Sequence, residues 1–208
     1  MRKYLVALVL LSCLMGILYL FWSQELKYFL PTPVPVNYNP PALRQQIDLR
    51  SIPGYQAKTA MYLHFFNPDC PCSRFNQKHF NSLVREYSGD VKVFAVIPAY
   101  ADVERARGMI DDKNVTVLQD HSDLLAAACG VYSTPQAVII DANEKLFYRG
   151  NYNKSRYCTL KESNYAEIAL HALRNGLEPP PSNPLASKAY GCELPSETGS
   201  PNILTILP

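Results

Sequence analysis

The hydrophobic and polar positions separate an uninterrupted apolar run near the N-terminus from a patterned central region. Residues 4–22 carry no charge and span nineteen positions. A helix of that length measures about 28 Å, close to the roughly 30 Å hydrocarbon core of a bilayer. Arg2 and Lys3 precede the run, which by the positive-inside rule places residues 1–3 in the cytoplasm. The pattern predicts a retained transmembrane signal anchor, because the apolar region of a cleaved signal peptide is shorter and ends in small residues.

The central region alternates between apolar strand patterns and helical stripes. Its expected elements are strands at 59–66, 91–97 and 115–118, helices at 73–87, 102–110 and 120–128, a hairpin of 137–141 with 145–149, and a last helix that ends at Gly176. Such alternation predicts an α/β fold, with a central mixed, mostly parallel sheet and helices on both faces.

Proline divides the exported part of the chain into a folded unit and two flanks. Five prolines lie in 31–41 and seven in 179–208. We expect a Pro-rich linker at 23–44 that acts as a semi-rigid spacer, a folded domain at 45–176, and a C-terminal tail at 177–208 without regular structure.

Composition and charge exclude several classes of function. The chain has 208 residues, 48% of them hydrophobic, which excludes a disordered protein. The formal charge of +2 arises entirely from residues 1–30, so no electrostatic case exists for binding nucleic acid. Six cysteines are too few for a disulfide-stapled miniprotein but sufficient for redox or metal chemistry.

A thiol stands where the first buried strand turns into a helix, in the run Cys70-Pro71-Cys72-Ser73. The N-terminus of a helix presents unpaired N–H groups and partial positive charge, which stabilise a thiolate. Arg74 adds positive charge in the first turn, whereas Asp69 opposes it. This placement predicts a nucleophilic cysteine at position 70, with Cys72 as its partner and Ser73 as a hydrogen-bond donor to the thiolate.

Two motifs give the chain a resemblance to the thioredoxin-like superfamily over roughly 45–175. They are the strand–turn–helix at 65–71 and the run at 130–141 that contains Thr134-Pro135. The chain looks most like the membrane-anchored, extracytoplasmic TlpA-type and AhpC/TSA-type members. The resemblance implies a cis proline at Pro135 and a substrate groove formed by Thr134 and Pro71, in which Thr134 offers its backbone to a substrate.

The chain departs from the family pattern at the second cysteine. The usual motif is Cys-x-x-Cys, but Ser73 holds the second position and Cys72 is additional. Two redox schemes therefore stay open, one in which Cys70 cycles with Cys72 and one in which a distant cysteine resolves the attack by Cys70.

The other candidate residues have less specific surroundings. His64 lies six residues before Cys70 and is either a proton relay to the thiol or a hydrogen-bonded residue of the strand. Cys158 and Cys192 are candidates for a structural disulfide that pins the tail, although spacing alone does not fix connectivity. Cys129 is expected in the core and Cys13 in the membrane.

The preferred function is thiol–disulfide exchange with protein substrates at the bacterial inner membrane. The anchor places the domain in the periplasm, where disulfides persist. The expected partners are protein thiols or disulfides and an electron donor or acceptor; no cofactor or metal is expected.

Two alternatives remain open. One is a non-catalytic binding or assembly module that carries copper or zinc on Cys70 and Cys72, with His64 or His79 as further ligands. The other is a peroxidase of the peroxiredoxin type, which is less favoured because Asn67 stands where that class has threonine.

Overall fold

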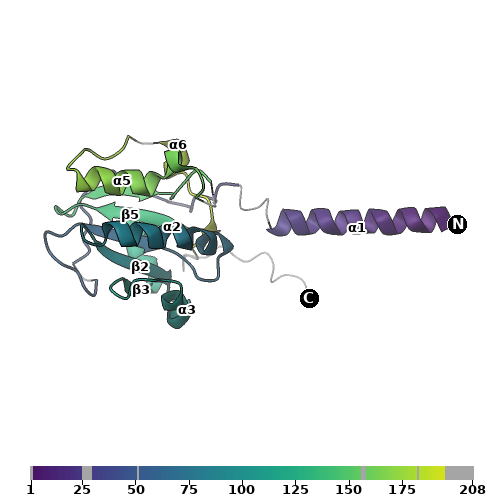
Figure 1. The fold of residues 1–208 in the computed structure, drawn as a ribbon, viewed down its shortest axis with the longest axis horizontal. Helices are drawn as coiled ribbons and strands as arrows, with labels where there is room; N and C mark the ends of the chain where they lie inside the picture. Colours follow the sequence, from purple (N-terminus) through teal and green to yellow (C-terminus); the bar gives the residue numbers. More distant parts are fainter. Residues whose placement is uncertain (1, 25–29, 51, 156–157, 182, 195–208) are drawn as a thin grey trace.

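A computed structural model describes residues 2–24, 30–50, 52–155, 158–181 and 183–194. Its first element, α1 (Arg2–Gln24), is a helix that extends away from the rest of the chain (Figure 1). The apolar side chains of α1 are exposed, and the stretch Arg2–Ser23 is long and apolar enough to cross a membrane. These properties fit the expected anchor and are shared by a signal sequence near the N-terminus.

The core of the folded unit is a five-stranded mixed sheet in the order β3-β2-β1-β5-β6. The strands are β1 (Met61–Phe65), β2 (Lys92–Pro98), β3 (Thr116–Asp120), β5 (Gln136–Ile140) and β6 (Leu146–Gly150). β1, β2 and β3 run parallel, whereas β5 pairs antiparallel with both β1 and β6. The structure confirms the predicted mixed α/β sheet and its late hairpin.

Helices cover both faces of this sheet (Figure 1). The helices are α2 (Pro71–Tyr87), α3 (Val103–Gly108), α4 (Leu124–Cys129) and α5 (Tyr165–Arg174), with short 3-10 turns at His121–Asp123 and Lys161–Ser163. α2 and α5 pack on one face together with Ala106 of α3, whereas α4 covers the other together with Ile47, Leu49 and Ile52. The arrangement is that of the thioredoxin-like fold.

Strand β1 is buried on both sides because it lies at the centre of the sheet. Tyr62 faces the layer of α2 and α5, whereas Met61, Leu63 and Phe65 face the layer of α4. The period of two along a strand assigns these side chains to opposite faces. A strand buried on both faces accounts for the continuous apolar run in the sequence.

The C-terminal tail forms regular structure, so the prediction of an unstructured segment was wrong for its described part. It contains α6 (Pro184–Ser187) and β7 (Cys192–Glu193), and β7 pairs with β4 (Ser133–Thr134). The Asn183 side chain accepts a hydrogen bond from the backbone of Leu185 and so caps α6. Residues 195–208 lie outside the described part of the chain.

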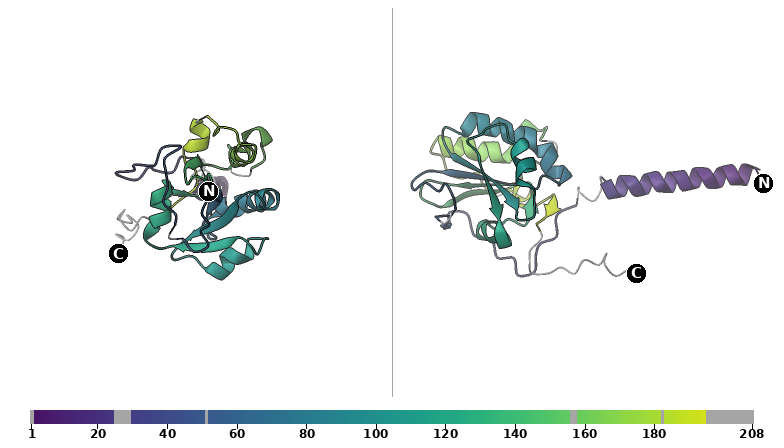
Figure 2. Two further views of the ribbon diagram at one scale, coloured as in Figure 1. Left: turned by 90° about the vertical axis from the view of Figure 1, so that its left-hand side faces the viewer. Right: turned by 90° about the horizontal axis from the view of Figure 1, so that it is seen from below.

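Part of the Pro-rich linker lies against the domain instead of spanning open space. The Thr32 N–H donates to the carbonyl of Ala189 in the tail. Tyr38 donates its hydroxyl hydrogen to the carbonyl of Gly130, 2.6 Å away. The linker and the yellow β7 strand therefore lie side by side at one end of the domain (Figure 2, right).

Candidate active site

Cys70 caps the N-terminus of α2 at the carboxyl end of β1. Pro71 occupies the first helical turn, where its missing N–H removes no helical hydrogen bond. The loop before the helix is closed by the Cys70 N–H, which donates to the Asn67 carbonyl at 3.0 Å. The Asn67 side chain accepts a hydrogen bond from the Asp69 N–H at 2.9 Å. The sulfur of Cys70 is therefore held at a helix N-terminus by a short, internally bonded turn.

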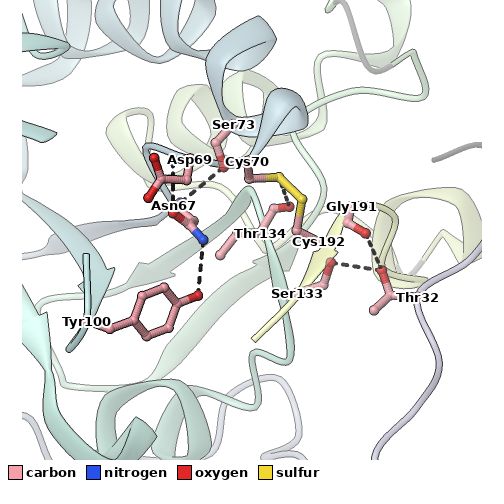
Figure 3. The surroundings of a disulfide bond; sticks show 10 residues. All are labelled: Thr32, Asn67, Asp69, Cys70, Ser73, Tyr100, Ser133, Thr134, Gly191 and Cys192. Atoms are coloured by element: carbon pink, nitrogen blue, oxygen red, sulfur yellow. Dashed lines mark hydrogen bonds between the residues drawn. A yellow bond between two sulfur atoms is a disulfide. The ribbon is translucent and has the colours of Figure 1, made fainter. Parts of the chain in front are cut away.

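Cys70 forms a disulfide with Cys192 of β7 (Figure 3). The bond joins residues 122 positions apart, with Cα atoms 6.2 Å from each other. The expected Cys158–Cys192 disulfide is therefore wrong. Cys158 instead lies against α2, where its sulfur donates to the Asn76 side-chain oxygen at 3.0 Å, and burial raises the pKa of its thiol to about 12.

Cys72 brings a third sulfur to the same place. The sulfur atoms of Cys70, Cys72 and Cys192 all lie within 4.8 Å of one another. Cys70 is 2% exposed and Cys72 is 4% exposed, whereas Cys192 is only partly buried. The site thus contains one disulfide and one neighbouring thiol, an arrangement that permits exchange among three sulfurs.

The loop before β5 forms the other wall of the site. The Thr134–Pro135 peptide bond is cis, as the resemblance implied for Pro135. The sulfur of Cys70 lies 3.8 Å from the Thr134 carbonyl oxygen. The Thr134 backbone is not open to solvent, because Cys192 of the tail pairs with it.

The turn before α2 carries an ion pair, between Asp69 and Arg105, that the sequence did not predict. Asp69 opposes a thiolate at position 70, but its carboxylate is bound by Arg105 from α3. Both side chains are about half exposed, so the pair is screened by water. Arg105 therefore offsets part of the repulsion that Asp69 exerts on a nearby thiolate.

Ser73 is buried in the first turn of α2 and supports the loop. Its hydroxyl oxygen accepts a hydrogen bond from the Asn67 N–H at 3.1 Å, and the Asn67 amide in turn donates to the Tyr100 hydroxyl (Figure 3). In this bond the Ser73 hydroxyl is the acceptor, so its hydrogen is not used. The predicted donation of that hydrogen to a thiolate at Cys70 stays a prediction.

His64 lies in the core beneath α2. Its ring stacks on Phe66 and Phe80 with centroids 4.8 and 4.0 Å away. Burial lowers the pKa of His64 to about 3, so the imidazole is neutral. The Tyr152 hydroxyl lies 2.6 Å from Nδ1 and accepts a hydrogen bond from Tyr62. These contacts describe a hydrogen-bonded residue of the strand, and a relay role for His64 stays a prediction.

Histidines do not join the sulfur cluster among the described residues. The only group that could hold a metal ion there consists of Cys70, Cys72 and Cys192. The proposed His79 ligand is half-buried on α2, with its ring against that of Tyr152 and the two centroids 6.0 Å apart. Soft thiolates suit copper(I) or zinc, so reduction of the disulfide would provide three such ligands.

The remaining cysteines lie away from this cluster. Cys129 is fully buried at the end of α4, as expected, and burial raises the pKa of its thiol to about 12. Cys13 is exposed on α1. Their positions leave the three-sulfur cluster as the candidate reactive centre.

Sequence reasoning missed three residues that build the site: Thr32, Arg105 and Gly191. The Thr32 hydroxyl lies 2.9 Å from the Ser133 hydroxyl and donates to the Gly191 carbonyl at 3.3 Å (Figure 3). Gly191 precedes Cys192 in a segment of mixed composition that gives no periodic signal. The Gly-Cys dipeptide was the available clue, because glycine next to a reactive group permits close approach of two backbones.

Solved structures with TM-scores above 0.5 share the fold at low sequence identity. An uncharacterized conserved protein from Geobacillus kaustophilus is 22% identical, with 81% of this chain and 94% of that chain covered and a TM-score of 0.59. A hypothetical protein from Sinorhizobium meliloti 1021 is also 22% identical, with 68% and 82% covered and a TM-score of 0.55. A disulfide oxidoreductase secreted by Mycobacterium tuberculosis is 17% identical, with 58% and 84% covered and a TM-score of 0.42.

No curated protein matches the chain at significant similarity. A match to a family model extends from residue 42 to residue 193 and so includes every cysteine of the cluster. By this match, the chain belongs to the family described as Domain of unknown function (DUF6436).

Proposed function

We propose that the protein is a thiol–disulfide oxidoreductase that acts on protein thiols or disulfides. The observation that carries the proposal is the disulfide between Cys70 and Cys192, set at the N-terminus of α2 with Cys72 beside it. A helix N-terminus favours the thiolate form of a cysteine, and the thiolate is the attacking species in exchange.

The exchange needs no cofactor. A substrate thiolate attacks the Cys70 sulfur, the bond to Cys192 breaks, and Cys192 leaves as a thiolate that takes up the proton lost by the substrate. Attack by a second thiol of the substrate on the substrate sulfur of the mixed disulfide then releases the substrate as a disulfide and Cys70 as the leaving thiolate, which takes up a proton. The same steps in reverse reduce a substrate disulfide.

In the direction that reduces a substrate disulfide, two sulfurs within the chain are placed to attack Cys70 in the mixed disulfide and release the substrate as a thiol. Cys192 returns to Cys70 in the first scheme, and Cys72 attacks Cys70 in the second. The 4.8 Å limit on all three separations supports both schemes. Only the second scheme gives Cys72 the role predicted from the sequence, that of the partner of Cys70.

The test is reduction of insulin by dithiothreitol, with the full chain in non-ionic detergent and Cys13→Ser as the background. We expect Cys70→Ser to abolish catalysis, and the double variant Cys72→Ser with Cys192→Ser to accumulate a mixed disulfide with insulin. Cys158→Ser is the matched control, because that thiol is buried outside the cluster. Catalysis that survives Cys70→Ser would refute the proposal.

We also propose that α1 anchors the protein with the domain outside the cytoplasm, at the inner membrane of a bacterium. The exposed apolar surface of α1 and a disulfide at the site support this topology. Washing isolated membranes at alkaline pH tests the anchor, and protease added to spheroplasts tests the topology. Release of the protein into the wash, or protection of the domain from protease, would contradict the proposal.

A second candidate function is binding of a soft metal ion by the reduced cluster. The proximity of three sulfurs favours it, since trigonal thiolate sites suit copper(I). Titration of the fully reduced chain with copper(I), in competition with a chromogenic chelator, should reveal one tightly bound ion. The ion should be lost with Cys192→Ser, and an unchanged affinity in that variant would exclude the cluster as its site.

A further inference from the structure

The last described residues of the chain add a strand to β4. Cys192 is paired with Thr134 and Glu193 with Ser133 in antiparallel register. The Leu194 N–H donates to the Tyr132 carbonyl at 3.1 Å and extends the pairing by one residue. A segment bound by strand addition gains affinity from its main chain and specificity from the spaces left for its side chains. Here that register brings the sulfur of the added strand onto Cys70.

Gly191 is the residue that lets this strand approach. Its φ of +149° is rarely adopted by residues with a side chain. A Cβ at this position would lie 2.9 Å from the Thr134 carbonyl carbon and closer still to the carbonyl oxygen. It would also lie 3.1 Å from the Ser133 hydroxyl oxygen. The atoms it meets belong largely to backbone, which cannot move aside as the end of a flexible side chain can.

We propose that the groove between β4 and Cys70 selects protein substrates whose reactive cysteine directly follows a glycine in an extended segment. In this proposal Gly191–Cys192 is the chain's own occupant of that groove. The inference rests on the proposed function, because it requires Cys70 to exchange disulfides. A substrate thiolate attacks Cys70, Cys192 leaves with the electron pair of the broken bond and accepts a proton, and the substrate strand takes the place of β7.

The tail remains tethered when its disulfide opens. The Asn151 side-chain amide donates to the carbonyls of Leu185 and Lys188 at 3.0 and 2.6 Å, and Thr32 donates to the carbonyls of Ala189 and Gly191. Tethering keeps Cys192 at a high effective concentration near Cys70. An incoming substrate therefore competes with the tail for the groove. The tail thus regulates access of substrates to Cys70, and its own Gly-Cys sequence is the one that the groove is proposed to prefer.

The test uses peptides that copy residues 189–194, with the cysteine activated as a disulfide with 5-thio-2-nitrobenzoate. The reduced full chain carries Cys13→Ser and Cys192→Ser, which empties the groove of its own sulfur. Attack by Cys70 releases the yellow anion and gives a rate. We expect the Gly-Cys peptide to react about ten-fold or more faster than an otherwise identical Ala-Cys peptide. The same chain with Cys70→Ser measures the background from other thiols.

The outcomes separate this inference from the function on which it rests. Equal rates for the two peptides, well above the Cys70→Ser background, would overturn the selectivity and leave the oxidoreductase intact. Rates at background for both peptides and for the free activating reagent would overturn the proposed function, and the inference with it.

A second variant tests the tail as occupant without changing Cys70 or Cys192. Gly191→Ala should lower the fraction of chains with the Cys70–Cys192 disulfide in a fixed glutathione buffer, because the added Cβ disturbs the strand. It should also speed the reaction of the reduced chain with the Gly-Cys peptide. An unchanged disulfide fraction and an unchanged rate would contradict the role of the tail. Far-ultraviolet circular dichroism confirms that the domain is folded.

Discussion

Loss of the Cys70–Cys192 disulfide should destabilise the whole domain, because the bond closes a loop across nearly all of it. The two residues are 122 positions apart. In the chain-entropy model a loop of this length restricts the unfolded chain by about 5 kcal/mol at 25 °C. The released tail also gains freedom in the folded state, so we expect Cys192→Ser to lower the free energy of unfolding by about 3 to 5 kcal/mol.

Urea denaturation of the full chain in non-ionic detergent measures this loss. Tyrosine fluorescence reports on the domain, since the single tryptophan, Trp22, lies in α1. Dithiothreitol should lower the stability of the wild type to that of Cys192→Ser and should leave the variant unchanged. Cys158→Ser serves as the control for removal of a thiol outside the disulfide. Equal urea midpoints for the oxidised and reduced wild type would refute the reasoning.

Three further predictions concern the buried groups. Burial lowers the pKa of His64 to about 3, so the unfolded chain binds more protons than the folded one between that value and about 6.5. Stability should therefore fall as the pH drops through this window, by up to about 1.4 kcal/mol per pH unit, and His64→Gln should flatten the denaturation profile. Tyr152→Phe removes the hydrogen-bond partner of Nδ1 of His64. The variant should lower the free energy of unfolding, measured in urea, by about 1 to 3 kcal/mol, and a smaller loss would argue against that hydrogen bond. The thiols of Cys129 and Cys158, whose pKa values burial raises to about 12, should resist iodoacetamide at pH 8 until urea unfolds the domain, as mass spectrometry of the labelled peptides would show.

The fold was largely predictable because its signals are local. Strand β1 is buried on both faces, so its apolar run indicated a central strand without knowledge of its neighbours. The apolar positions of 73–87 follow the helical period, and the expected burial holds for Phe80, Leu83, Val84 and Tyr87 but was wrong for Phe75, which is 42% exposed. These features depend on residues a few positions apart, which a single sequence displays.

The site was predictable only in the part that is formed by residues close together in the sequence. The turn from β1 into α2 places Cys70 at a helix N-terminus, and the sequence alone revealed this. The partner Cys192 lies 122 positions away and reaches Cys70 through strand pairing with β4. No periodicity marks a two-residue strand in a Pro-rich tail, and cysteine spacing does not determine connectivity. The incorrect pairing of Cys192 with Cys158 follows from that limit.

In the proposed exchange, Cys192 takes the part that a second cysteine at position 73 has in the Cys-x-x-Cys motif. A second cysteine at position 73 would place both sulfurs of the disulfide at the start of α2, whereas here the partner sulfur of Cys70 lies on β7. The oxidised bond therefore fixes β7 against β4, and the backbone around Gly191 in turn binds Thr32 of the linker. Reduction removes the covalent link but leaves the hydrogen bonds of Thr32 and Asn151, each worth about 0.5 to 1.5 kcal/mol. The oxidation state of the Cys70–Cys192 pair thus decides how firmly residues 183–194 of the tail, and with them Thr32 of the linker, are held beside the site.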